Sequence, residues 1–169
     1  LPPDPTWRER APYSVRFLQP AKLSFRNHTF ELEQSAGSGG VDAFNQVTCW
    51  PSGELLARAM DHPSAPMSVR GRRVLELGSG TGVGGLYAAG LGAREVLLTD
   101  GRAGLAELQR ANIRQNEHLL PDPARISCAQ LRWGSDAPPP GPWDWVIGSG
   151  CTVEVADETM VALAATCAA

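Results

Sequence analysis

A glycine-rich turn that directly follows a short apolar segment limits the folds this chain can adopt. Residues 73–77 (Arg-Val-Leu-Glu-Leu) have the composition of a buried strand, and residues 78–82 (Gly-Ser-Gly-Thr-Gly) follow at once. The small and apolar residues after them, through Ala89, predict a helix. Glycines let the backbone bend sharply and let a ligand approach it closely. The segment therefore predicts the start of a βαβ unit with a ligand site at its turn, and a tight turn without a ligand is the simpler alternative.

Further strands and helices alternate along the rest of the chain. The sequence predicts strands at 95–100, 125–131 and 143–147, and helices at 103–118 and 157–167. Alternation at this spacing favours a parallel sheet with helices on both faces. The predicted fold class is therefore α/β, a Rossmann-like doubly wound and mostly parallel sheet.

Two of the predicted helices have an expected buried face. A helix before the glycine turn should begin after Trp50-Pro51, with Ser52 as its N-cap. Its buried face is predicted to consist of Leu55, Leu56, Ala59 and Met60. The buried face of the last helix is predicted to consist of Met160, Leu163 and Ala164.

The N-terminal part differs in character from the rest. Residues 1–14 are proline-rich and predict an extended lead-in, because each Pro removes a backbone donor. Apolar residues alternate on both sides of a polar turn at 26–29, which predicts a β-hairpin extension followed by a flexible loop, together spanning 15–40. Residues 41–169 would then form the α/β core, so that 15–169 make one domain.

Composition and charge narrow the classes of function. Fifteen basic and eighteen acidic residues give a net charge of −3, which offers no overall attraction to nucleic acid or an anionic membrane. No run of about 18 apolar residues occurs, so no membrane span is expected. The four cysteines and three histidines lack metal-ligand spacing, so we expect no metal and a reducing, cytoplasmic location, with the nucleus as an alternative. The chain begins at Leu1, which suggests a fragment.

Asp100 ends the second predicted strand of the core. A carboxylate at this place can accept both hydroxyls of a ribose bound over the glycine turn, which fits an adenosyl or a nicotinamide adenine cofactor. The segment Gly-Thr-Gly-Val-Gly-Gly from Gly80 also matches the dinucleotide pattern G-x-G-x-x-G, so the turn alone does not separate the two. A structural alternative makes Asp100 the N-cap of the next helix.

Two amides interrupt the apolar stripe of the predicted helix 103–118. Asn112 and Asn116 are four residues apart and share a face with Leu105 and Leu108. We expect their side chains to bond to the backbone under the sheet.

Several strings resemble the seven-β-strand S-adenosylmethionine-dependent methyltransferases. These are VLELGSGTGVGGLYAAGLGAREVLLTDG, the later NIRQN, LRWG at 131–134 and WDWVIGS at 143–149. Upstream, VTCWPSGELLARAM resembles the Trp-containing entry to the helix before the glycine motif in the branch of methyltransferase-like protein-lysine methyltransferases, sometimes called family 16. The likeness covers about residues 15–169. It implies S-adenosyl-L-methionine as the cofactor and a lysine side chain of a protein substrate as the methyl acceptor.

By this resemblance the cofactor-binding residues would be Trp50, Glu76, Gly78, Ser79, Gly80, Asp100, Trp133 and Ser149. Trp50 would lie near the methionine end of the cofactor, residues 78–80 would line its backbone side, and Asp100 would hold the ribose. Trp133 would stack on the adenine, and Ser149 would contact the cofactor from the fourth strand. Ordinary core packing is the alternative for Trp50 and Trp133.

The sequence departs from the family pattern after the fourth predicted strand. The family usually carries an Asp there and a Tyr three residues later, which frame the target lysine, whereas this chain has Gly150 and Val153. Glu154 could supply a substitute catalytic carboxylate near the amine. The alternative is that Glu154, Asp157 and Glu158 favour the N-terminal end of the last helix.

The core also looks incomplete, because the family's sheet has seven strands and four are predicted here. In the family topology the first and fourth strands are adjacent, so the cofactor crevice between them would survive. We therefore expect a methyltransferase acting on protein lysine. The alternatives are a non-catalytic relative that binds the cofactor or a partner, and an NAD(P)-dependent oxidoreductase that would explain only the overlapping G-x-G-x-x-G.

Overall fold

The structure, a computed structural model, describes residues 20–25, 28–34, 48–121, 125–152 and 156–168. The predicted lead-in, most of the loop after the hairpin and the positions of Val153 and Glu154 lie outside the described residues. In the described part of the chain, no helix is both long and apolar enough to span a bilayer.

The core is a four-stranded sheet, and all of its strands are parallel. The strands are β3 (Arg73–Leu77), β4 (Glu95–Asp100), β5 (Ile126–Gln130) and β6 (Trp145–Gly148), in the order β5-β4-β3-β6. β3 therefore pairs on one side with β4 and on the other with β6. This confirms the predicted parallel, Rossmann-like sheet and the adjacency of the first and fourth strands.

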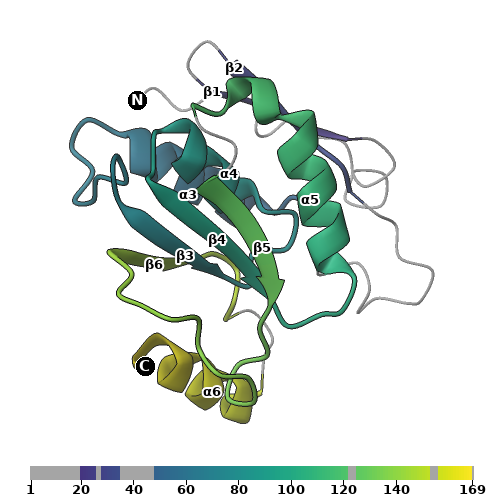
Figure 1. The fold of residues 1–169 in the computed structure, drawn as a ribbon, viewed down its shortest axis with the longest axis vertical. Helices are drawn as coiled ribbons and strands as arrows, with labels where there is room; N and C mark the ends of the chain where they lie inside the picture. The colour runs from purple at the N-terminus through teal and green to yellow at the C-terminus, as the bar shows by residue number, and fades with distance from the viewer. Residues whose placement is uncertain (1–19, 26–27, 35–47, 122–124, 153–155, 169) are drawn as a thin grey trace.

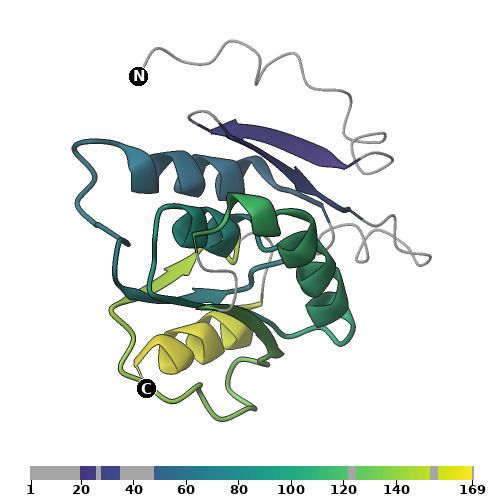
Figure 2. The same cartoon turned by 45° about the horizontal axis from the view of Figure 1, so that its top comes forward.

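Helices cover both faces of the sheet (Figures 1 and 2). α4 (Val83–Gly90) and α5 (Leu105–Gln115) lie on one face, with α3 (Pro51–Asp61) packed outside α4. α6 (Asp157–Ala168) lies on the other face. A short 3₁₀ turn, η2 (Glu117–Leu119), follows α5.

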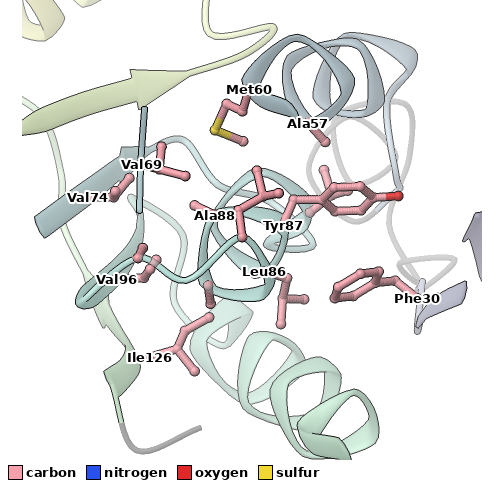
Figure 3. Close-up of a cluster of buried hydrophobic side chains, with 14 of the residues drawn as sticks. Phe30, Ala57, Met60, Val69, Val74, Leu86, Tyr87, Ala88, Val96 and Ile126 are labelled. Atoms are coloured by element: carbon pink, nitrogen blue, oxygen red, sulfur yellow. The ribbon is translucent and has the colours of Figure 1, made fainter. Parts of the chain in front are cut away.

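Alternate residues of the strands supply the two halves of the core. On the α4 side, Val74 and Val96 pack with Leu86 and Ala88, and all four are fully buried (Figure 3). On the α6 side, a smaller cluster consists of Leu75, Leu77 and Leu131, with Leu97, Trp133, Trp143 and Leu163 packed against it. The period-2 pattern of β3 thus points one set of side chains to each layer of helices.

The N-terminal hairpin packs onto the main core. β1 (Ala21–Phe25) and β2 (His28–Leu32) are antiparallel, with Leu23 opposite Phe30. Phe30 is 2% exposed and stacks on Tyr87 of α4, with ring centroids 4.7 Å apart. The predicted hairpin is confirmed. The turn is shorter than predicted, because β2 already begins at His28, inside the predicted turn at 26–29.

Two predicted details of α3 are wrong. Trp50 is the N-cap and Pro51 occupies the first turn, where its fixed φ and missing N–H fit, so Ser52 lies inside the helix. Met60 is buried as predicted, but the other buried residues are Gly53, Glu54 and Ala57, whereas Leu55 is 69% exposed and Ala59 is also exposed. The helix is rotated from the predicted face because glycine at position 53 permits close packing on α4.

The buried face of α6 also differs from the prediction. Thr166 is its buried residue, Leu163 is half-buried, and Met160 and Ala164 are exposed. The Thr166 hydroxyl donates to the carbonyl of Ala162 at 2.9 Å, so the polar group is satisfied within the helix. Because this intrahelical bond satisfies the hydroxyl, threonine can be buried at a position outside the predicted face.

The two asparagines of α5 bond to the backbone as predicted, but their main partner is the hairpin. Asn116 accepts from Glu31 N at 2.9 Å and donates to Glu31 O at 2.7 Å. Asn112 accepts from Glu33 N at 2.7 Å and donates to the carbonyls of Glu33 and Thr81. The outer edge of β2 is thereby held by side chains of α5.

Candidate functional site

The glycine turn joins the carboxyl end of β3 to α4. Gly78, Gly80 and Gly82 have φ values of 62°, 50° and 85°, in the left-handed region that glycine adopts without strain. The N–H of Ser79 donates to the carbonyl of Thr99 at 2.9 Å, which holds the turn against the end of β4. The turn thus lies where parallel α/β sheets bind ligands.

Asp100 lies beside this turn. Its Oδ2 accepts from Gly80 N at 3.0 Å and its Oδ1 accepts from Arg102 N at 3.2 Å. Burial raises the pKa of this carboxyl, and the Gly80 amide partly offsets that effect. A carboxylate has about four acceptor positions, so capacity for further donors remains. The N-cap of α5 is Gly104, so the helix-cap alternative for Asp100 is wrong.

Gly78 brings three segments into contact. A β-carbon at this position would lie 2.8 Å from Cys151 Sγ and 3.2 Å from the Trp133 ring. Cys151 follows β6, and Trp133 follows β5. Within the described part of the chain, the buried indole Nε1 of Trp133 has no hydrogen-bond partner. The lack of a side chain at Gly78 therefore lets the loop after β5 and the loop after β6 approach the turn closely.

A second convergence involves the start of α3. A β-carbon at Gly53 would lie 2.5 Å from Val83 Cγ1 and 3.5 Å from Ser149 Oγ. A β-carbon at Gly150 would lie 3.1 Å from Ser52 Oγ. The first turn of α3, which Trp50 precedes, is thus packed against the start of α4 and the loop after β6.

Glu76 is directed toward α4. The side chain is 2% exposed, and its Oε2 accepts from Gly85 N at 2.8 Å. Its Oε1 lies against the position that a β-carbon at Gly84 would take. Burial raises the pKa of Glu76 to about 8, although the amides of Gly85 and Gly84 act in the opposite direction. The glycines of α4 therefore make room for this carboxyl group.

The structure brings together most of the residues that the sequence singled out. Gly78, Ser79, Gly80, Asp100 and Trp133 gather around the turn at the ends of β3 and β4. Their contacts with a cofactor, and those of Trp50, Glu76 and Ser149, stay predictions.

Three neighbours of the site were missed by sequence reasoning. Cys151 and Gly53 lie at the two convergences, and nothing in their local pattern marks them. Gln109 of α5 donates to Ser79 Oγ at 2.8 Å and to Gly80 O at 3.0 Å. Its spacing of three residues from Asn112 was a signal that could have identified it.

Comparison with known proteins places this geometry in a family. The family model for lysine methyltransferases matches residues 25–167. The mouse protein N-lysine methyltransferase METTL21A is 32% identical over 139 residues, which cover 79% of this chain and 59% of the relative. The Arabidopsis thaliana calmodulin-lysine N-methyltransferase is 33% identical over 66% of this chain and 37% of its own length. The chain thus spans about three fifths of the METTL21A relatives.

Among solved structures, SMU.776, described as a putative methyltransferase complexed with SAH, has a TM-score of 0.48 and 16% identity over 68% of this chain and 26% of that one. The family model covers most of the sequence, and the METTL21A relatives exceed 30% identity over more than two thirds of it. The chain therefore belongs to the lysine methyltransferase family.

Proposed function

We propose that this chain binds S-adenosyl-L-methionine and transfers its methyl group to a lysine side chain of a protein substrate. The observation that carries the proposal is the convergence at the glycine turn, where the Trp133 ring lies against Gly78 and Asp100 accepts from the amide of Gly80. Family membership supports the same chemistry, and the named relatives are lysine methyltransferases.

The residues at this point fit an adenosyl group. A ribose presents two hydroxyl donors, and Asp100 retains acceptor positions beside the turn. Adenine presents a flat face and edge acceptors, which suit the ring of Trp133 and its buried, unpartnered Nε1. Gly78 has no side chain, so the backbone of the turn lies directly beside the Trp133 ring and the proposed adenine site.

The methionine end of the cofactor would lie toward the start of α3. Trp50 is the N-cap of α3, and Ser149 belongs to the second convergence, where Gly53 lets α3 approach the loop after β6. When bound, S-adenosylmethionine supplies a sulfonium methyl group that a neutral amine can attack. The part of the protein is to align the amine with that methyl group and to exclude water, because misalignment lowers the rate steeply.

The position that would orient the substrate lysine carries no polar side chain, and this favours a second candidate function. Gly150, at the place where the family usually carries an Asp, has no side chain to orient an amine, and its φ is 70°. A relative that binds the cofactor with little catalysis of its own is the second candidate. The nicotinamide alternative has less support, because the matching family model and the named relatives are lysine methyltransferases.

We also propose a cytoplasmic setting, with the nucleus as the alternative. The described structure has four free cysteines, which suits a reducing compartment.

Calorimetric titration with S-adenosylhomocysteine, beside NADH, tests the cofactor. We expect saturable binding of S-adenosylhomocysteine and no heat of binding with NADH. Binding of NADH alone, or of neither ligand by a folded chain, would contradict the proposal. Methyl transfer from radiolabelled S-adenosylmethionine to the proteins of a cell lysate is then measured. A lysate whose lysine side chains have been blocked is the control.

A further inference from the structure

Three buried amide side chains form a row along α5. Gln109, Asn112 and Asn116 are 0%, 0% and 1% exposed. Their spacing of three and four residues places them on one face of the helix. Figure 1 shows α5 reaching from the carboxyl ends of the strands to the hairpin. The row therefore contacts the glycine turn at one end and β2 at the other.

Gln109 is the member of the row that contacts the turn most closely. Its Nε2 donates to Ser79 Oγ at 2.8 Å and to Gly80 O at 3.0 Å. The Ser79 hydroxyl donates in turn to the carbonyl of Thr99 at 2.9 Å. One amide group thus links α5, the turn and the end of β4.

The orientation of this amide is fixed by its partners. A carbonyl oxygen can only accept, so the NH₂ group of Gln109 must face Gly80 O. Its Oε1 is then buried, and no donor among the described residues reaches it. A buried acceptor without a partner destabilises a fold, so an apolar side chain would serve better if packing were the only requirement. The two hydrogen bonds that Gln109 donates to the turn explain better why an amide side chain occupies this position.

We propose that Gln109 is a positioning residue that sets the conformation of the cofactor turn. This inference rests on the proposed function, because the turn is assigned there to the cofactor. The bond to Gly80 O directs that carbonyl toward α5, and in a trans peptide the N–H of Thr81 then points the opposite way. On the other flank, Gly80 N donates to Asp100 Oδ2 at 3.0 Å. Gln109 and Asp100 thus hold the two sides of one glycine.

Asn116 provides a matched control on the same helix. It is as buried as Gln109, but its bonds go to Glu31 N and O and to the carbonyl of Asn112. None of these atoms belongs to the turn. A variant of Asn116 therefore removes a buried α5 amide without removing a bond to residues 78–82.

The first measurement compares Gln109→Met with Asn116→Leu, each close in size to the residue replaced. At a temperature where all proteins are folded, Gln109→Met should weaken S-adenosylhomocysteine binding by about tenfold, because two hydrogen bonds to the turn are lost. Asn116→Leu should lower the melting temperature and leave the affinity unchanged. Unchanged affinity in Gln109→Met, or equal affinity losses in both variants, would overturn the proposal.

A second measurement does not depend on the ligand. Amide hydrogen exchange at residues 80–82 should be faster in Gln109→Met than in the unmodified chain, and unaltered in Asn116→Leu. If the unmodified chain binds no S-adenosylhomocysteine, the proposed function fails, and exchange still decides the role of Gln109.

Gln109→Glu covers the case in which the Met variant does not fold. An ionised carboxylate cannot donate to Gly80 O. The ratio of the amide exchange rates at residues 80–82 in Gln109→Glu to those in the unmodified chain should therefore grow as pH rises. The same exchange rates in both proteins at every pH would overturn the proposal.

Discussion

Two carboxyl groups at the glycine turn have different surroundings and should behave differently on substitution. Asp100 lies beside the turn and keeps acceptor positions after bonding Gly80 and Arg102. Glu76 lies under α4, where it bonds Gly85 and is closed off from solvent. Substitution of Asp100 should therefore change the affinity for the ligand, and substitution of Glu76 should change the stability of the fold.

Asp100→Ala should weaken S-adenosylhomocysteine binding by about 1.5–3 kcal/mol, the usual range for hydrogen bonds to a charged group. Titration calorimetry measures the change, with Asp100→Asn separating loss of charge from loss of size. Glu107→Ala, which removes an exposed carboxylate of α5, is the control and should bind normally. Full affinity in a folded Asp100→Ala variant would remove this residue from the site.

Glu76 should make stability depend on pH. Its pKa is about 8 in the folded state, against a reference value of 4.5. Between these values the folded protein retains a proton that the unfolded chain releases, so the free energy of unfolding falls as pH rises, by up to about 1.4 kcal/mol per pH unit. Below pH 4.5 the contribution is fully present, and above pH 8 it is lost.

Urea unfolding at several pH values from 5 to 8 compares the chain with Glu76→Gln. We expect the variant to show a flatter dependence on pH, because glutamine does not titrate. Parallel curves for the two proteins would show that Glu76 does not retain its proton in the folded state.

At the scale of elements, the hairpin is fastened to the core by Phe30. Its ring is 2% exposed and stacks on Tyr87. Phe30→Ala should therefore lower the free energy of unfolding by about 3–5 kcal/mol, the usual loss for a large buried aromatic. Ser24→Ala, on the exposed side of the same hairpin, should change it by less than about 0.5 kcal/mol. Chemical denaturation measures both, and a similar small loss for both would mean that the hairpin contributes little to folding.

Sequence patterns predicted elements better than helix faces. The strands that became β3 to β6 were identified because buried parallel strands are short, apolar and separated by helices. The faces of α3 and α6 were not, because their contacts depend on residues that hydrophobicity does not rank, such as Gly53 and Thr166.

The candidate site shows the same division. Gly78 and Asp100 were found from the motif, since glycine and carboxylate at a strand end have a direct physical meaning. Cys151 and Gln109 reach the turn through tertiary contacts that the local sequence does not encode. The structure was needed to place them.

At the scale of the molecule, cofactor binding and methyl transfer should separate. The turn and Asp100 are present, whereas Gly150 and Val153 are predicted to stand where the family usually orients the lysine. We expect the chain to bind S-adenosylhomocysteine but to transfer methyl groups slowly. Introducing Gly150→Asp together with Val153→Tyr should raise transfer to lysate proteins at similar cofactor affinity. Rapid transfer by the unmodified chain would move the orienting role to Glu154 or another residue.

The central position of β3 has a consequence for the order of folding. Its partner β4 follows closely in sequence, but its other partner β6 comes much later, and Arg73 N bonds Asp144 Oδ2 across 71 residues. Closing a long loop costs more chain entropy than closing a short one, so contacts distant in sequence form more slowly. β3, β4 and β5 can therefore assemble first, with β6 docking onto an edge that already exists. Because the loop after β6 brings Cys151 to the turn at Gly78, the candidate site is completed only in this last step. The competence to bind a ligand should therefore be the final property that a refolding chain acquires.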